Sequence, residues 1–234
     1  KTDITITDTG FNNTETDSGR LSLYGSYQAD NYYLDAQLAY SQLTYQSNRQ
    51  IITGLQAANE HEGNQYSLRL RASRPIAFDM GLEAKTQLTP RLALNYRNLS
   101  EEAYDETGAG SAGLHIDNIK TDTLVLAAGG ELSHAFKLGA YTLIPEFHAT
   151  LEYDLLAEQA EMSANFLLAD DLASQLPSTQ FVTKSAELEP LTLQSGLGLQ
   201  LFNDRHLSVH LRYDYRYRKD YTGQSYSAAL RYDF

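Results

Sequence analysis

The chain has 234 residues, a formal net charge of −12, 42% hydrophobic residues and a mean hydropathy of −0.43. No apolar run approaches the roughly 20 residues that a membrane-spanning helix requires, so the composition excludes a helical membrane protein. The acidic balance argues against nucleic-acid binding, because such proteins need Lys and Arg on one face to displace phosphate counterions.

The residue types favour many short strands. The chain contains 17 Tyr and five Pro but no Trp and no Cys. Aromatic rings suit pleated strands and the interfacial belts of membrane barrels. The lack of Cys is compatible with an oxidising cell envelope without disulfides. No positively charged, apolar leader opens the sequence at Lys1, so we expect any secretion signal to have been removed or to lie upstream.

Ten segments alternate between apolar and polar residues. In a membrane barrel, alternate side chains face lipid and lumen, so each strand shows about ten residues of such alternation. We therefore predict strands, in chain order, at Thr2–Thr9, Leu21–Tyr27, Tyr32–Tyr40, Tyr66–Leu70, Leu92–Tyr96, Leu124–Leu132, Tyr141–Tyr153, Leu191–Leu201, His206–Arg218 and Tyr226–Phe234. The fold class predicted from them is an all-β, antiparallel transmembrane β-barrel.

The segment His206–Arg218 shows the pattern most clearly. Every odd position from Leu207 to Tyr217 is apolar and every even position is polar. At this chain's composition, that window arises by accident roughly once in ten thousand times. The last segment repeats the pattern and ends on an aromatic residue. Its predicted lipid-facing set is Tyr226, Ala228, Leu230, Tyr232 and Phe234.

The connections between these segments alternate in length. Short turns are predicted at Ala29–Asn31, Pro75–Asp79, Ala135–Ala140 and Asn203–Arg205. Long polar connections are predicted at Gly10–Asp17, Tyr45–Gly63, Leu99–Asp117 and Leu155–Glu189, with one short exception at Lys219–Thr222. Outer-membrane barrels place long loops outside the cell and short turns in the periplasm, so both chain ends are predicted to be periplasmic. A soluble antiparallel sandwich also alternates, but its connections should be short on both sides.

One stretch of the largest connection has helical character. Residues Leu155–Leu176 are rich in helix formers with weak 3.6-residue spacing, which predicts a short helix within the loop. The whole chain, residues 1–234, is thus predicted to form one barrel domain.

Several short segments resemble recurrent segments of the autotransporter β-domain, the barrel of type V secretion. They are Ser22–Tyr27, Tyr32–Ala36, Leu88–Pro90, Tyr104 with Glu106 and Gly108, and the ending Ala229–Phe234. Their order and spacing match that family from about Asp17 to Phe234. The ending also resembles the terminal signal by which outer-membrane proteins recruit the barrel-assembly machinery.

The resemblance implies an outer-membrane translocator that anchors an N-terminal passenger and permits its export. It implies twelve strands, a linker helix through the lumen, monomeric behaviour, and contact with outer-membrane lipid and lipopolysaccharide. Only ten strands can be identified here, so we expect a C-terminal fragment, a structure without its first strands, or a related ten-stranded barrel closed between Thr2–Thr9 and Tyr226–Phe234.

Charged residues at alternate positions are predicted to face the lumen, where both signs can pair in water. The resemblance implies that they contact the passenger or its linker. They are Arg69, Arg71, Arg97, Glu146, Glu152, Asp154, Arg212, Asp214, Arg216 and Arg231. We predict no cofactor, no metal and no catalysis.

Two rival functions remain open: a barrel hydrolase, either protease or lipase, and a diffusion pore. Ser208 and His210 share one strand face, but positions two apart are roughly 6.5–7 Å distant, too far for a direct Ser–His hydrogen bond. His115 with Asp117, and His148 near Glu146 and Glu152, are weaker candidates for a base or a metal site. Gly108–Gly113 spells a dinucleotide fingerprint but lies in a predicted loop, so a flexible turn is the better interpretation.

Overall fold

The structure is a computed structural model. It describes residues 2–8, 12–52, 54–79, 81, 86–157, 159–167, 180–186, 189–203, 207–219 and 221–232, with the backbone alone for residues 2–8 and 52. Within these residues, no helix is long and apolar enough to cross a membrane.

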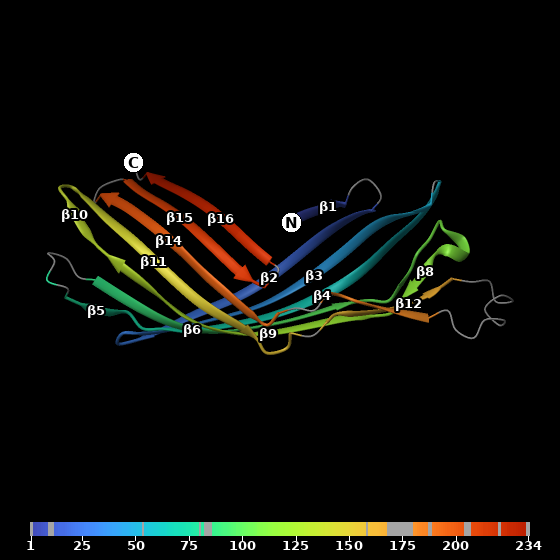
Figure 1. Cartoon of the computed structure of the whole chain (residues 1–234), viewed down its shortest axis with the longest axis horizontal. Helices are drawn as coiled ribbons and strands as arrows, with labels where there is room; N and C mark the ends of the chain where they lie inside the picture. Colours follow the sequence, from blue (N-terminus) through green and yellow to red (C-terminus); the bar gives the residue numbers. More distant parts are fainter. Residues whose placement is uncertain are drawn as a thin grey trace.

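Ten long antiparallel strands form one curled sheet in which each strand pairs with the next one along the chain (Figure 1). They are β1 (Thr2–Asp8), β2 (Asn12–Ala29), β3 (Tyr32–Ile52), β4 (Leu55–Ser73), β6 (Thr86–Glu101), β9 (Ile119–His134), β11 (Tyr141–Asp154), β14 (Leu191–Asn203), β15 (Leu207–Arg218) and β16 (Tyr221–Tyr232). All ten predicted strands are confirmed.

Two short strands lie inside segments predicted as turns. β5 (Ile76–Phe78) pairs with β6, and β10 (Phe136–Leu138) pairs with β11. The chain reverses direction after each of these strands. The two turns therefore lie a few residues later in the sequence than predicted. We call this edge of the sheet the turn end and the opposite edge the loop end.

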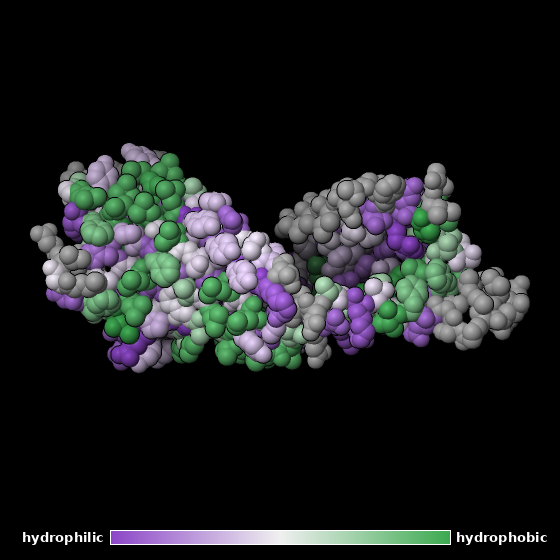
Figure 2. Space-filling model, in the orientation of Figure 1, coloured by the Kyte–Doolittle hydropathy of each residue, from purple (hydrophilic) through white to green (hydrophobic). Residues whose placement is uncertain are grey.

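The pairing register separates the two faces of the sheet. Residues directly opposite each other on neighbouring strands point to the same face, and the outward face is almost entirely apolar. Leu23 pairs with Leu38, which pairs with Leu68, and Leu211 pairs with Ala228. Figure 2 shows hydrophobic residues gathered over much of the barrel wall.

This outward face has little protein covering it. Leu21 is 76% exposed, Tyr226 75% and Leu230 72%. A soluble monomer rarely exposes so continuous an apolar surface. The Tyr40 and Tyr66 rings are in contact toward the loop end, tilted at 45° with centroids 5.1 Å apart. Tyr32 lies at the turn end with the Arg74 guanidinium 4.8 Å from its ring. Apolar residues bounded by aromatic ones form the belt that a bilayer requires.

The described sheet is open rather than closed. β1 pairs with residues 12–18 of β2, so the edge of β2 from residue 19 to residue 29 lies beyond it. No backbone pairing in the described chain joins β16 to β1 or β2, and Figure 1 shows a gap between them. The possible closure of Thr2–Thr9 against Tyr226–Phe234 is therefore not the arrangement observed.

Polar strands extend the wall beyond the apolar belt, where the sequence predicted loops. β2 begins at Asn12 and the β3–β4 hairpin spans Tyr45–Gly63, so the long connections predicted at Gly10–Asp17 and Tyr45–Gly63 are wrong. These strands carry no apolar alternation because neither face meets lipid at this height. Polar composition alone therefore did not distinguish them from loops.

The two longest connections also contain strands. β7 (Tyr104–Asp105), β8 (Leu114–Ile116), β12 (Glu161–Phe166) and β13 (Gln180–Lys184) form a second sheet in the order β13-β12-β8-β7. It joins β4 through paired backbone bonds between Ala58 and Thr107. The helix predicted over Leu155–Leu176 is wrong for residues 161–166, which form β12. Residues 168–179 lie outside the described chain. We call β7, β8, β12, β13 and the β3–β4 hairpin from Ser41 to Asn64 the collar.

Adjacent alanines on β16 test which face meets lipid. Ala228 pairs with Leu211 on the outward face, whereas Ala229 pairs with His210 on the inward face. Ala228→Arg should destabilise the folded barrel by up to about 2–4 kcal/mol, less if the site lies near an interface, whereas Ala229→Arg should be nearly neutral. Urea unfolding of the full-length protein in lipid vesicles would measure both. Equal costs for the two variants would contradict the assignment of faces.

Candidate functional site: a polar lumen

The inward face of the sheet carries all ten residues predicted to line the lumen. Arg97 pairs with Ser67 of the same face, Arg216 with Gln194, and Arg231 with Ser208. The ten residues are Arg69, Arg71, Arg97, Glu146, Glu152, Asp154, Arg212, Asp214, Arg216 and Arg231. The structure therefore places them on one concave surface. It also shows which of them meet.

Several inward charges form ion pairs with other residues of the same face. Arg216 Nη2 lies 2.5 Å from Glu152 Oε2, and Arg212 Nε lies 3.1 Å from Asp214 Oδ2. Arg71 instead pairs with Asp35, at 2.8 Å between Nη2 and Oδ2. These contacts are partly exposed, and exposed pairs contribute about 0–1 kcal/mol each. Their main effect is to hold the side chains in a fixed, hydrated lining.

A tighter cluster forms around His148 on β11. His148 is 5% exposed, and its Nε2 lies 2.8 Å from Asp214 Oδ1 and 3.1 Å from Arg212 Nη2. The imidazole crosses β14 to reach these partners on β15. It does so over Gly196, where a Cβ atom would lie 2.5 Å from His148 Cε1. A glycine at this position is thus required by the close approach of the ring.

Other inward residues were not predicted as lumen contacts. Arg20 lies on β2, Asp35 pairs with Arg71, and Arg91 Nη2 lies 2.8 Å from Glu131 Oε2. Each occupies an inward position in the alternation of its strand. Each of these three residues lies directly beside a leucine of the outward face in the sequence. Their place in the alternation could therefore have identified them as inward.

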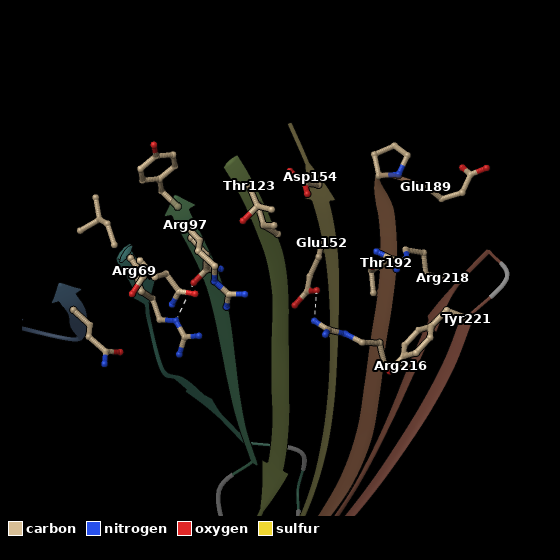
Figure 3. A pocket seen from close by; sticks show the side chains of 18 of the residues that line it. Arg69, Arg97, Thr123, Glu152, Asp154, Glu189, Thr192, Arg216, Arg218 and Tyr221 are labelled. Atoms are coloured by element: carbon tan, nitrogen blue, oxygen red, sulfur yellow. Dashed lines mark hydrogen bonds and ion pairs between the residues drawn. The ribbon is translucent and has the colours of Figure 1, made fainter. Parts of the chain in front are cut away.

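Toward the loop end, the inward face contains a cavity of about 600 Å³, lined from both halves of the sheet. Arg69 and Arg97 lie on one side, and Glu152 with its partner Arg216 lies on the other (Figure 3). Of the predicted residues, these four and Asp154 line the cavity, whereas Glu146, Arg212 and Asp214 lie nearer the turn end around His148. Glu146 Oε1 accepts a hydrogen bond from Gln200 Nε2 at 2.5 Å.

The inward face continues into the collar as an aromatic row. The His61 ring stacks between Tyr45 and Tyr104, at centroid distances of 4.9 and 4.0 Å. Burial raises the pKa of both tyrosine hydroxyls. One row further out, Arg49 binds Glu106 through two hydrogen bonds of 2.9 and 2.5 Å, which raise the pKa of the guanidinium. The collar therefore continues the polar channel.

The residues considered for catalysis do not assemble into a catalytic site in the described chain. No hydrogen bond joins Ser208 to His210, although both face the lumen. His115 lies on the surface of the collar with Nδ1 2.6 Å from Asp105 Oδ1 and Nε2 3.4 Å from Asp117 Oδ1. The hydrogen bond to Asp105 raises the pKa of His115. No group of three or more His, Cys, Asp or Glu side chains among the described residues is placed to hold a metal ion.

The glycine-rich segment Gly108–Gly113 forms a tight turn around the short 3₁₀ helix η1 (Gly110–Ala112). Gly108 and Gly110 have φ values of +87° and +55°. Such backbone favours glycine, which accounts for these residues without a nucleotide.

The closing strand β16 presents its predicted residues outward. Tyr226 pairs with Tyr213, Leu230 with Val209 and Tyr232 with Leu207. Phe234 lies outside the described residues. The Tyr213 and Tyr226 rings contact each other at a tilt of 39° with centroids 5.0 Å apart, as expected for cross-strand aromatic partners in a lipid-facing belt.

Comparison with known proteins assigns the family. Residues 1–214 match the model described as "Autotransporter beta-domain". The chain belongs to the autotransporter β-domain family. It is an outer-membrane translocator domain, as its resemblance to the family implied. Its fold is similar to the translocator domain of the autotransporter NalP from Neisseria meningitidis, with a TM-score of 0.67, 21% identity, and coverage of 97% of this chain and 70% of that one.

Curated relatives are longer proteins. This autotransporter β-domain is 25% identical to "Esterase EstA" of Pseudomonas aeruginosa over 216 residues, covering 91% of this chain and 32% of that protein. It is 24% identical to "Outer membrane protein A" of Rickettsia conorii over 228 residues, covering 93% of this chain and 11% of that protein. The chain thus spans about a third or less of the relatives that it matches.

The His148 cluster can be tested through the glycine beneath it. A Cβ atom at residue 196 would lie 2.3 Å from Tyr213 O as well as against the His148 ring. Gly196→Ala should therefore lower the free energy of unfolding by about 1–3 kcal/mol through overpacking. Gly25→Ala is the matched control, since nothing lies within 4 Å of its Cβ position. Thermal unfolding in detergent measures both, and equal midpoints would contradict the packing argument.

Proposed function

We propose that this β-domain anchors an N-terminal passenger in the outer membrane and permits its export, with residues 1–234 forming one translocator domain at the C-terminal end of a longer protein. The family match and the exposed apolar belt around a polar concave face support this function. The belt provides the anchor, and the hydrated inner face provides a path that an extended polypeptide can cross.

Closure of the barrel is the next element of the proposal. Backbone groups within the hydrocarbon region must all be paired, so an open edge in lipid is unstable. Residues 19–29 of β2 and the outer edge of β16 carry such groups. Two upstream strands, as expected for a twelve-stranded domain, would lie between β16 and the β1–β2 edge and complete the cylinder.

The orientation follows from the asymmetry of the two ends. The collar is polar and tall, whereas the connections at the turn end are short. We assign the collar to the cell exterior and the turn end, with the C-terminus, to the periplasm. Lipopolysaccharide would then contact the outward face near Tyr40 and Tyr66, and phospholipid the face near Tyr32.

The inward charges are the proposed contacts of the passenger and its linker helix. Arg69, Arg97 and the Arg216–Glu152 pair line the cavity of the inward face, where a polypeptide filling the lumen would lie. The domain itself is proposed to be monomeric and non-catalytic and to need no cofactor. Its outward terminal strand is proposed to recruit the barrel-assembly machinery through Tyr226, Ala228, Leu230, Tyr232 and Phe234.

Export from cells carrying the full-length gene tests this function directly. Protease added to intact cells should release passenger fragments from the wild type. Deletion of residues 221–234 removes one edge strand and the proposed assembly signal, so we expect loss of both barrel insertion and passenger exposure. Lys184→Gln serves as a control, because it breaks an exposed collar pair with Glu161. Surface-exposed passenger in the deletion strain would refute the proposal.

The hydrolase alternative predicts that alanine substitution of the candidate catalytic residues abolishes a hydrolytic activity of the barrel. Ser208, His210, His115 and Asp117 are each replaced by Ala in the full-length protein. If the barrel only translocates, passenger exposure should stay within about twofold of the wild type, and hydrolysis of ester or peptide substrates should be unchanged. Loss of a hydrolytic activity in any of these variants would assign catalysis to the barrel.

A diffusion pore is distinguished by conductance. Stable conductance of the full-length protein that is unaffected by removal of its upstream linker would favour a pore over a translocator with an occupied lumen.

A further inference from the structure

A second hollow lies on the outward face, across the last three strands of the sheet. It is a shallow groove of about 460 Å³ formed by β14, β15 and β16. The apolar residues that line it all occupy outward positions in their strands, and they are Leu197, Leu199, Leu211, Tyr213, Tyr226 and Ala228. The groove is therefore open to the membrane and separate from the lumen.

The groove arises from a difference in side-chain size between two neighbouring rows of the pairing register. One row contains Tyr213 and Tyr226, whose rings contact each other with centroids 5.0 Å apart. In the next row, Ala228 pairs with Leu211, which pairs with Leu199. Because the methyl group of Ala228 is much shorter than a tyrosine side chain, the surface is recessed beside the tyrosines. Leu211 lies in this recess and is 46% exposed.

Lipid hydrocarbon is the medium that meets this face, because the chain is an outer-membrane domain with its apolar side outward. Atoms that line an empty recess lose their dispersion contacts on that side, so filling the groove is favourable. An acyl chain is flexible and carries no polar group along its length, so it can follow the groove without leaving a buried hydrogen-bonding group unpaired. Its preference for the groove comes from packing, since lipid tails are as apolar as leucine.

The position of the groove along the strands selects one leaflet. Leu211 lies nearer to Leu207, at the turn end of β15, than to Tyr217 at the loop end. Leu207 pairs with Tyr232, an exposed tyrosine of the kind that marks the interface of a membrane barrel. With the turn end in the periplasm, the groove therefore lies in the half of the membrane that phospholipids occupy.

We propose that this groove binds one acyl chain of a phospholipid from the periplasmic leaflet, which gives the barrel a specific lipid site beside its terminal strand. The choice of phospholipid rests on the proposed function, because it requires the turn end to face the periplasm. The groove itself depends only on the described strands β14, β15 and β16.

Native mass spectrometry of the full-length protein tests the site with two defined lipids. The protein is released from nanodiscs that contain phosphatidylethanolamine and lipopolysaccharide, and the lipids that remain bound are identified by mass. We expect the wild type to retain one phosphatidylethanolamine molecule. Ala228→Leu fills the groove with a larger apolar side chain, so the retained fraction should fall by at least about fivefold. Ala36→Leu makes the same change on the outward face of β3 and should retain the lipid like the wild type.

Three results would overturn the proposal. The first is equal retention in the wild type and Ala228→Leu, or a wild type that retains no lipid. The second is retention of lipopolysaccharide in place of phosphatidylethanolamine, which assigns the groove to the other leaflet. The third is a wild-type dimer that Ala228→Leu converts to a monomer, which assigns the groove to a second copy of the chain.

A second pair of variants keeps the test independent of barrel assembly, because Ala228 also belongs to the proposed assembly signal. Leu211→Phe enlarges a side chain inside the groove and should lower retention, whereas Leu92→Phe makes the same change on the outward face of β6 and should not. If Ala228→Leu does not assemble, equal retention in these two variants overturns the proposal. Passenger exposure on wild-type cells reports on export, whereas lipid retention by the purified protein reports on the groove, so the two failures are distinguishable.

Discussion

Backbone hydrogen bonding in a solvent without water is the constraint on which this molecule depends. Within the bilayer, each N–H and C=O group must find a partner inside the sheet. The chain meets this demand by pairing every long strand with its sequence neighbour, from β1 to β16. The same demand makes the edges at β16 and at residues 19–29 of β2 the least stable part of the described sheet, because their groups face a gap. Closure is therefore the step on which the lumen and its chemistry depend.

Once strands surround a channel, the two-residue period of a strand assigns every side chain to lipid or water. The outward positions are filled by Leu and Tyr, and the inward positions of the same strands carry charge. Among the residues that the structure describes, arginines outnumber carboxylates on the inward face of the long strands. The arginines are Arg20, Arg69, Arg71, Arg91, Arg97, Arg212, Arg216, Arg218 and Arg231. The carboxylates are Asp35, Glu131, Glu146, Glu152, Asp154 and Asp214 on the strands, and Glu189 at the cavity beside β14. Many other acidic residues lie in the collar and the turns. The whole chain is therefore acidic, although arginines predominate on the inward face.

Alternation predicted the strands and the face of each residue, because both follow from the local sequence. It did not predict which charges pair. Asp214 was expected only to face the lumen, whereas the structure joins it to His148 from a strand 66 residues away. That contact depends on Gly196 lying between them, which is a property of register rather than of either segment. The same limit applies to Arg71, whose partner Asp35 lies one strand earlier.

The collar escaped prediction for a different reason. Lipid imposes apolar alternation only on residues at membrane height, so Tyr45–Gly63 and Glu161–Phe166 pair as strands without that pattern. Their stability must come from contacts specific to the collar. Arg49 extends past Ala57, which is fully buried, and hydrogen-bonds to Glu106, the residue that follows β7.

Removing one member of a buried ion pair leaves the other charge without compensation. The Arg49–Glu106 pair therefore fixes β7, and through it β8 and β12, to the β3–β4 hairpin. The inward face thus continues past the apolar belt into the collar. A polypeptide that leaves the membrane would still be bounded on this side by the row of Tyr45, His61 and Tyr104. The effective channel is consequently longer than the apolar belt.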